Sequence, residues 1–244
     1  MELGLRERYR LLERELAEVS RAAGRDPCAV AVVAVTKAQP VAAVREAVAA
    51  GIAEIGENYL QEARAKFEEL ASQPGVSMPR KHFIGHLQTN KAAAIAATFD
   101  LVQSVDRIEA GRALAKAARS LGKVLPVLVQ VNVSASPRYG CDPERAEALA
   151  EELRAEQGLA VDGVMAIGPL AADRESIARA FEAAAKTFRR VGGKTLSMGM
   201  SGDWREAVRH GSTMIRIGTA LFGPRPVPHI YGAAPGNEET RLVS

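Results

Sequence analysis

The 244-residue chain has only two cysteines, Cys28 and Cys141, which is too few for a four-thiolate zinc site. A disulfide between them is not expected, because two cysteines in a chain of this length fit a reducing compartment. Aromatic residues are also scarce, and no apolar run approaches the ~18 residues that a membrane-spanning helix needs. Residues 1–20 are charged and lack the apolar core of a signal peptide. We therefore expect a cytoplasmic protein with no membrane segment.

The chain also lacks a strong excess of one charge. Its 32 basic and 29 acidic residues leave a net charge of +3, and they are interleaved along the sequence. No nucleic-acid-binding motif is present, so the slight positive excess fits a small anionic ligand better than a nucleic acid. The G-x-S-x-G, H-E-x-x-H and Walker motifs are absent, which excludes the enzyme classes built on them.

What the chain does have is a regular alternation of short apolar runs and amphipathic segments. A long opening helix is expected over Glu2–Ala23, and Asp106, Asp142 and Asp173 are expected to cap later helices. Eight strands are expected between the helices, at Ala29–Val35, Ala53–Gly56, Lys81–Gly85, Leu101–Ser104, Val124–Val133, Val161–Ala166, Thr195–Met198 and Thr213–Ile217.

Strict alternation of this kind predicts a parallel sheet with right-handed crossovers. Eight such units match a single (β/α)8 TIM barrel with an extra N-terminal helix, and a doubly wound open sheet is the alternative. The barrel would occupy residues 1–225, and residues 226–244, which are rich in proline and glycine, would form a flexible tail.

Lys37 follows the first apolar run, with only Thr36 between them. The run is almost continuously apolar and β-branched, as a strand buried on both faces should be. The carboxyl end of such a strand is where α/β barrels place their chemistry. A lysine in a low-dielectric setting loses its proton more readily, and the neutral amine can form a Schiff base with a carbonyl. Lys37 is therefore a candidate nucleophile, although a strand-end lysine can also simply reach solvent.

A second constellation follows the last two expected strands. Gly199, Gly202 and Gly218 would let the backbone approach a ligand closely, and Ser201 and Thr219 offer hydroxyl groups. Loops at these places in barrels often bind phosphate, because the helices that follow present free N–H groups.

A ligand with both an aldehyde and a phosphate would connect Lys37 to this constellation. Pyridoxal 5′-phosphate (PLP) is the obvious ligand of this kind. A sugar phosphate bound by a PLP-free Schiff-base aldolase is an alternative that the same residues allow.

Five motifs along the chain resemble the YggS/PROSC family of pyridoxal phosphate homeostasis proteins. They cover about residues 5 to 225 and are Ala34-Val-Thr-Lys37, Ile55-Gly-Glu-Asn-Tyr59, His82-Phe-Ile-Gly-His-Leu-Gln-Thr-Asn-Lys91, Leu196-Ser-Met-Gly-Met-Ser201 and Gly211-Ser-Thr-Met-Ile-Arg-Ile-Gly-Thr-Ala-Leu-Phe-Gly223. The chain departs from the usual pattern at His86 and over residues 135–140. The departures lie outside the lysine and phosphate motifs and concern the outer rim.

The resemblance implies a barrel like that of alanine racemase (fold type III) that holds PLP as a Schiff base on Lys37. It implies that the phosphate lies against Ser201, Gly218 and Thr219, and that Arg216 faces the pyridine nitrogen. It also implies that Asn58, His82 and Met200 belong to the cofactor-binding site.

An arginine beside the pyridine nitrogen only donates hydrogen bonds, so it would keep that nitrogen unprotonated and make the ring a weaker electron sink. Alanine racemase also uses a tyrosine from a second domain, and the candidates for that role here are Tyr59 and Tyr231. We expect a PLP-binding protein of intracellular PLP homeostasis, with little or no catalysis, that acts as a monomer or weak dimer. Apo PLP-dependent enzymes are the expected partners, and an amino-acid racemase is the alternative function.

Overall fold

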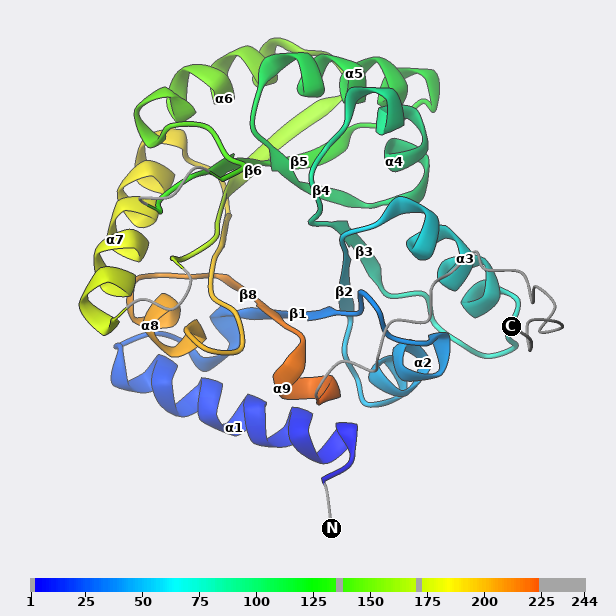
Figure 1. The fold of residues 1–244 in the computed structure, drawn as a ribbon, viewed down its shortest axis with the longest axis vertical. Coiled ribbons are helices and arrows are strands. Elements are labelled where there is room, and N and C mark those ends of the chain that lie inside the picture. Colours follow the sequence, from blue (N-terminus) through cyan, green and yellow to red (C-terminus); the bar gives the residue numbers. More distant parts are fainter. Residues whose placement is uncertain (1–2, 135–137, 170–172, 224–244) are drawn as a thin grey trace, which may run out of the picture.

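The computed structural model describes residues 3–134, 138–169 and 173–223. Eight parallel strands form a closed barrel in sequence order, and the first strand pairs with both the second and the last (Figure 1). The predicted (β/α)8 architecture is confirmed. The strands are β1 (Ala31–Val35), β2 (Glu54–Glu57), β3 (Arg80–Phe83), β4 (Leu101–Val105), β5 (Leu125–Val131), β6 (Leu159–Ala166), β7 (Thr195–Ser197) and β8 (Met214–Ile217).

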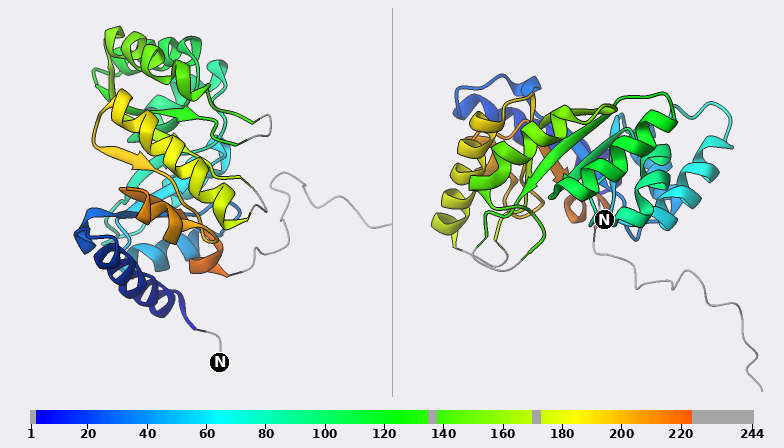
Figure 2. Two further views of the ribbon diagram at one scale, coloured as in Figure 1. Left: turned by 90° about the vertical axis from the view of Figure 1, so that its left-hand side faces the viewer. Right: turned by 90° about the horizontal axis from the view of Figure 1, so that it is seen from above.

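The helices form a ring around the barrel, which Figures 1 and 2 show from three directions. Within the described residues they are α1 (Leu5–Ala22), α2 (Val41–Ala49), α3 (Leu60–Ala71), α4 (Ala92–Thr98), α5 (Ile108–Ser120), α6 (Ala146–Ala155), α7 (Arg174–Val191), α8 (Trp204–Arg209) and α9 (Thr219–Phe222). Short 3-10 helices are η1 (Pro27–Ala29), η2 (Thr89–Lys91) and η3 (Pro143–Arg145).

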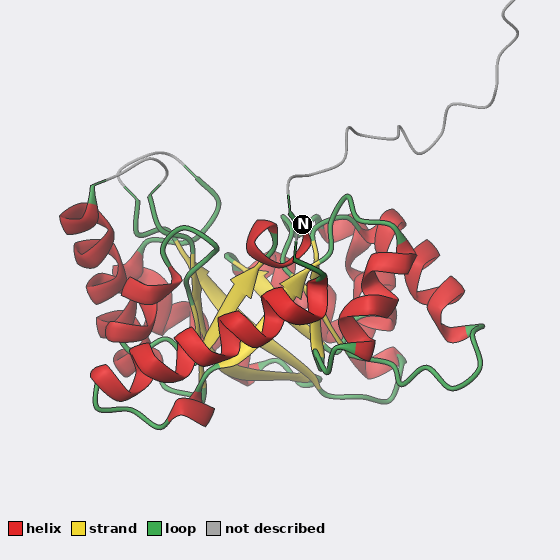
Figure 3. Ribbon diagram, turned by 90° about the horizontal axis from the view of Figure 1, so that it is seen from below, coloured by secondary structure: helices red, strands yellow, loops and turns green. Residues whose placement is uncertain are grey.

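The opening helix α1 is the extra helix that the sequence predicts. It packs beside α8 and α9 and crosses the front of the barrel in Figure 3. Its apolar stripe of Leu5, Leu12 and Leu16 is buried in the hydrophobic core that the outer helices share. The helix after β8 has only four residues, so α1 covers part of the sector beside β8. None of the helices in the described ranges is long and apolar enough to cross a membrane. The predicted tail, 226–244, lies outside the described residues.

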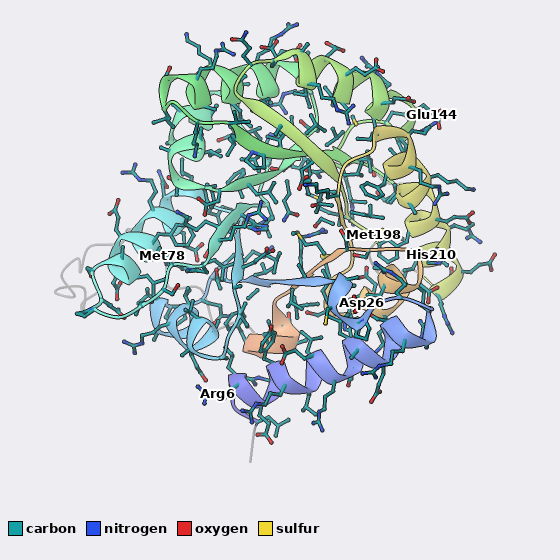
Figure 4. All side chains as sticks on the ribbon, turned by 180° about the vertical axis from the view of Figure 1, so that it is seen from behind. Arg6, Asp26, Met78, Glu144, Met198 and His210 are labelled. Atoms are coloured by element: carbon teal, nitrogen blue, oxygen red, sulfur yellow. The ribbon has the colours of Figure 1, made fainter. Side chains whose placement is uncertain are left out.

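Apolar side chains fill the space on both sides of the strands. A small inner cluster of Val33, Leu101, Leu128, Met165 and Met214 lies inside the barrel. A larger cluster joins the outer faces of the strands to the helices, and side chains crowd the whole cross-section in Figure 4. A densely packed interior holds the strand ends in fixed positions, so the loops that follow them can form a rigid site.

The predicted helix caps differ in outcome. Asp173 accepts a hydrogen bond from the first turn of α7, as expected. Asp142 caps the 3-10 helix η3 instead of α6 itself. The prediction for Asp106 is wrong, because its carboxylate binds the guanidinium of Arg107 at 2.7 Å and α5 starts without a side-chain cap. The Asp106 carboxylate therefore binds the neighbouring Arg107 side chain and does not accept from the N–H groups at the start of α5.

Candidate functional site

A cavity of about 260 Å³ opens at the carboxyl ends of the strands. This volume is slightly below the ~300–1,000 Å³ typical of small-molecule sites. Among the residues that line it are all the predicted site residues except His82, namely Lys37, Asn58, Met200, Ser201, Arg216, Gly218 and Thr219. Residues far apart in the sequence thus meet in one place because the first and last strands are neighbours in the closed barrel.

Lys37 lies in a tight turn directly after β1. The turn is closed by a hydrogen bond from the Gln39 N–H to the Thr36 carbonyl, at 3.0 Å. Lys37 itself is half-buried and reaches the cavity wall. The next residue, Ala38, has a φ of 58°, which is uncommon for a residue other than glycine. The residue that follows the lysine therefore has a left-handed backbone conformation.

Two glycine-containing loops after β7 and β8 form another part of the cavity wall. Across the described residues, the N–H groups of Ser201, Gly202, Gly218 and Thr219 have no hydrogen-bond acceptor within the protein. The Ser201 hydroxyl accepts a bond from the Ala220 N–H at 3.3 Å, which joins the two loops. Free N–H groups in neighbouring loops can donate to a phosphate, and we call these two loops the anion-binding wall.

The glycines of these loops have different roles. A Cβ on Gly199 would lie 2.7 Å from the Ala207 Cβ, so this glycine allows α8 to pack closely on the strand end. A Cβ on Gly202 would meet no protein atom within 4 Å, although the residue lines the cavity. Gly202 therefore leaves space for a ligand, and Gly199 serves the packing of the protein itself.

Arg216 on β8 is a buried cation at the cavity. Its guanidinium donates to the Ser197 hydroxyl at 2.7 Å and to the Ala166 carbonyl at 2.9 Å. Burial lowers the Arg216 pKa to about 10, and the nearby Asp203 carboxylate opposes this shift. The side chain is therefore protonated at neutral pH and held in one orientation from two sides.

His82 does not line the cavity, in contrast to the role that the resemblance implies. It is fully buried inside the barrel, where its Nδ1 lies 2.8 Å from the Gln103 side-chain amide nitrogen. Because an amide nitrogen only donates, Nδ1 must accept this bond. Burial lowers the His82 pKa to about 3, so the ring is neutral. The Ser197 hydroxyl donates to the Gln103 oxygen at 2.7 Å, and a buried chain thus connects His82 to Arg216.

We expect Ser197→Ala to lower the free energy of unfolding by about 1–3 kcal/mol, the usual effect of leaving a buried partner unsatisfied. The change removes the acceptor for Arg216 and the donor for Gln103 together. Urea denaturation followed by circular dichroism measures the effect. A stability equal to that of the wild type would contradict the importance of this chain.

Asn58 offers a second polar contact in the cavity. Its Oδ1 is buried and has no hydrogen-bond partner within the described part of the chain, although the residue lines the cavity wall. A buried polar atom without a partner is costly unless a ligand or water satisfies it. No cluster of three or more His, Cys, Asp or Glu side chains suited to a metal ion occurs in the described ranges.

Sequence reasoning missed a cluster of charges beneath the Lys37 turn, two of which are buried. The Lys66 ammonium on α3 lies 2.8 Å from Glu57 and 2.6 Å from Glu62, and only 3% of the Lys66 side chain is exposed. The signal was available, since Lys66 shares the inward face of α3 with Ala63, Phe67 and Leu70. A charged residue on an otherwise apolar helix face implies a buried partner.

The fold and this cavity define a class of protein: a single barrel whose first strand carries an amine and whose last strands carry an anion-binding wall. The family model described as "Alanine racemase, N-terminal domain" matches residues 10–226. An alanine racemase from Clostridium difficile 630 has the same fold, with a TM-score of 0.70 at 15% identity. The match covers 88% of this chain and 57% of that chain.

The chain belongs to the pyridoxal phosphate homeostasis protein family. It is 44% identical to the "Pyridoxal phosphate homeostasis protein" of Pseudomonas aeruginosa over 221 residues, which covers 89% of this chain and 93% of that protein. PipY of Synechococcus elongatus, solved "with PLP bound", is 36% identical with a TM-score of 0.73. That match covers 85% of this chain and all of that chain. The family predicted from the sequence is thereby confirmed.

Proposed function

We propose that this protein binds PLP through Lys37 and the anion-binding wall, and that it serves the intracellular homeostasis of this cofactor. One observation carries the proposal: a single cavity of about 260 Å³ is lined both by an amine and by four N–H groups without an acceptor among the described residues. PLP supplies an aldehyde that condenses with an amine, with loss of water, and a phosphate that accepts hydrogen bonds. The family membership and the PLP-bound relative support the same conclusion.

The chain's own residues fit this ligand. Lys37 would provide the amine, and the N–H groups of Ser201, Gly202, Gly218 and Thr219 would donate to the phosphate. The guanidinium of Arg216 and the N–H groups of the two loops suit an anionic ligand. The side chains of Met165, Ile84 and Ile167 add an apolar wall of the kind that a ring needs.

We infer that the site holds PLP with little or no catalysis. Arg216 carries a hydrogen on every nitrogen, so it would donate to the pyridine nitrogen and leave that nitrogen unprotonated. Of the described residues that line the cavity, Lys37 carries the one side-chain amine, and none carries a carboxyl, imidazole, phenol or thiol group. The candidate second base Tyr59 is 63% exposed and lines a neighbouring depression, and Tyr231 lies outside the described residues.

A protein that holds PLP reversibly can deliver it to other proteins. We propose that apo PLP-dependent enzymes are its partners, since a covalent bond to a lysine can be exchanged for a bond to another amine. Transfer is measured as the rate at which an apo-enzyme gains activity from the loaded protein, with free PLP at the same concentration as reference. Reactivation that only follows the release of free PLP would contradict delivery.

The limited catalysis is tested with a panel of L-amino acids and chiral chromatography of the products. We expect no turnover beyond that of free PLP in solution. Robust racemisation of any one amino acid would overturn this part of the proposal and establish the alternative function, an amino-acid racemase.

We expect Gly202→Ala to weaken the binding of PLP about tenfold, because the added methyl group enters the space beside the proposed phosphate position. The fold should be unaffected, since the new Cβ meets no protein atom within 4 Å. Equilibrium dialysis measures the affinity and thermal unfolding the stability. Unchanged affinity would place the phosphate elsewhere.

A further inference from the structure

We propose that Glu57, Lys66 and Glu62 are positioning residues that hold Lys37 in the orientation needed to attack an aldehyde. The inference deepens the proposed function and rests on it in taking Lys37 as the point of attachment. The three residues form one charged cluster on β2 and α3, beneath the Lys37 turn, in which Glu57 and Lys66 are buried and Glu62 is partly buried. None of them lines the cavity, so they act on the ligand only through the backbone of Lys37.

The peptide group before Lys37 is held through Thr36. The Lys66 ammonium donates to the Thr36 carbonyl at 2.5 Å, and the Thr36 hydroxyl donates to the Glu57 carboxylate at 2.7 Å. Both Thr36 and Glu57 are fully buried. Hydrogen bonds to charged groups are stronger than those between neutral groups, so this peptide plane cannot rotate freely.

The peptide group after Lys37 is held through Ala38. The Ala38 N–H donates to the Glu62 carboxylate at 2.6 Å. Ala38 has a positive φ of 58°, which its surroundings must enforce because an alanine rarely adopts it. The Glu62 bond supplies one such constraint at the residue that needs it.

Together the two contacts fix the direction of the lysine side chain. The planes on both sides of the Lys37 Cα determine its φ and ψ, and these set the direction of the Cα–Cβ bond. Lys66 binds both carboxylates, so the two constraints form one rigid unit. Burial of the Glu57–Lys66 ion pair is costly and seldom adds stability over an apolar core, which favours a role for this cluster beyond packing.

The experiment compares three variants of the full-length protein. Glu62→Ala removes the acceptor for the Ala38 N–H, Glu62→Gln keeps an oxygen acceptor, and Glu69→Ala is the matched control on the exposed side of the same helix. The rate of covalent PLP attachment is followed by absorbance and by mass spectrometry after borohydride reduction. Binding of pyridoxine 5′-phosphate, which has no aldehyde, tests the anion-binding wall separately. Hydrogen exchange of the amides of residues 36–39 is measured without ligand.

We expect Glu62→Ala to slow attachment about tenfold or more, because a small misplacement of a reacting group has an effect of this size. Its exchange at residues 36–39 should be faster than in the wild type, with pyridoxine 5′-phosphate bound normally. Glu62→Gln should retain most of the attachment rate, and Glu69→Ala all of it. Attachment and exchange at wild-type rates in Glu62→Ala would overturn the inference, and so would an equal loss in Glu62→Gln.

Uptake of PLP at Lys37 and the rigidity of the Lys37 turn are measured separately. A wild-type protein that takes up no PLP at Lys37 would overturn the proposed function. The amide exchange of ligand-free Glu62→Ala would still show whether the cluster holds the turn.

Discussion

Replacing Lys37 with alanine is expected to abolish covalent attachment of PLP and leave the barrel folded. Lys37 is half-buried in a loop, so its removal empties no part of the core. The amine is the attacking group, and no other side chain lining the cavity within the described residues carries one. Mass spectrometry after borohydride reduction should find about one PLP per wild-type chain and none in the variant.

The matched control is Lys116→Ala, which removes an exposed lysine on α5. This control should retain full attachment. The variant Lys37→Ala should still bind pyridoxine 5′-phosphate, because the N–H groups of the loops after β7 and β8 are unchanged. Attachment that persists in Lys37→Ala would assign the covalent site to another lysine.

Lys66→Met is expected to destabilise the protein by about 3–5 kcal/mol at neutral pH, the usual effect of removing one partner of a buried ion pair. The substitution leaves the fully buried Glu57 without its counter-ion. Lys186→Met, which breaks an exposed pair with Glu182, should cost less than about 1 kcal/mol. Urea denaturation of both variants measures the difference, and equal losses would contradict the importance of the buried cluster.

The decrease in the free energy of unfolding caused by Lys66→Met should become smaller as the pH falls. Burial already raises the Glu57 pKa above its ordinary 4.5, and Lys66 opposes that shift, so its removal raises the pKa further. A group whose pKa is raised on folding favours the folded state at low pH, and this contribution is lost as the pH rises through the folded-state pKa. The variant should therefore be closer to the wild type near pH ~5 than at neutral pH.

Much of the fold could be predicted because the barrel strands are visible in the sequence as short apolar runs. The run ending at Val35 and the run over Val124–Val133 were found in nearly the right places, although the structure starts the first strand at Ala31 after a 3-10 helix. Strand ends are harder to predict, because a β-branched apolar residue suits a strand and the segment just before it equally well. The alternation of elements was enough to predict the closed barrel.

The sequence predicted which residues meet in the cavity where strand order decides it, and it missed contacts that depend on side-chain packing. Lys37 and the loop glycines stand at strand ends, and the strand order brings strand ends together. His82 belongs to a motif of the family but turns into the barrel, where Gln103 holds it. The apolar face of α3 signals that Lys66 is buried, but which carboxylates bind it depends on how α3 packs on β2, because one partner, Glu57, lies on that strand.

Because β1 pairs with β8, the proposed PLP site is complete only when both ends of the barrel are present. Lys37 follows the first strand, and Arg216 lies on the last strand, where it pairs with Val33 of the first. During synthesis the lysine leaves the ribosome long before the residues that would grip the phosphate. A nascent chain therefore cannot bind PLP at this site until nearly the whole barrel has emerged. Bound PLP would then connect the residues after β1 to those after β7 and β8 and so stabilise the pairing of β1 with β8. Capture of the cofactor would then report that the barrel has closed.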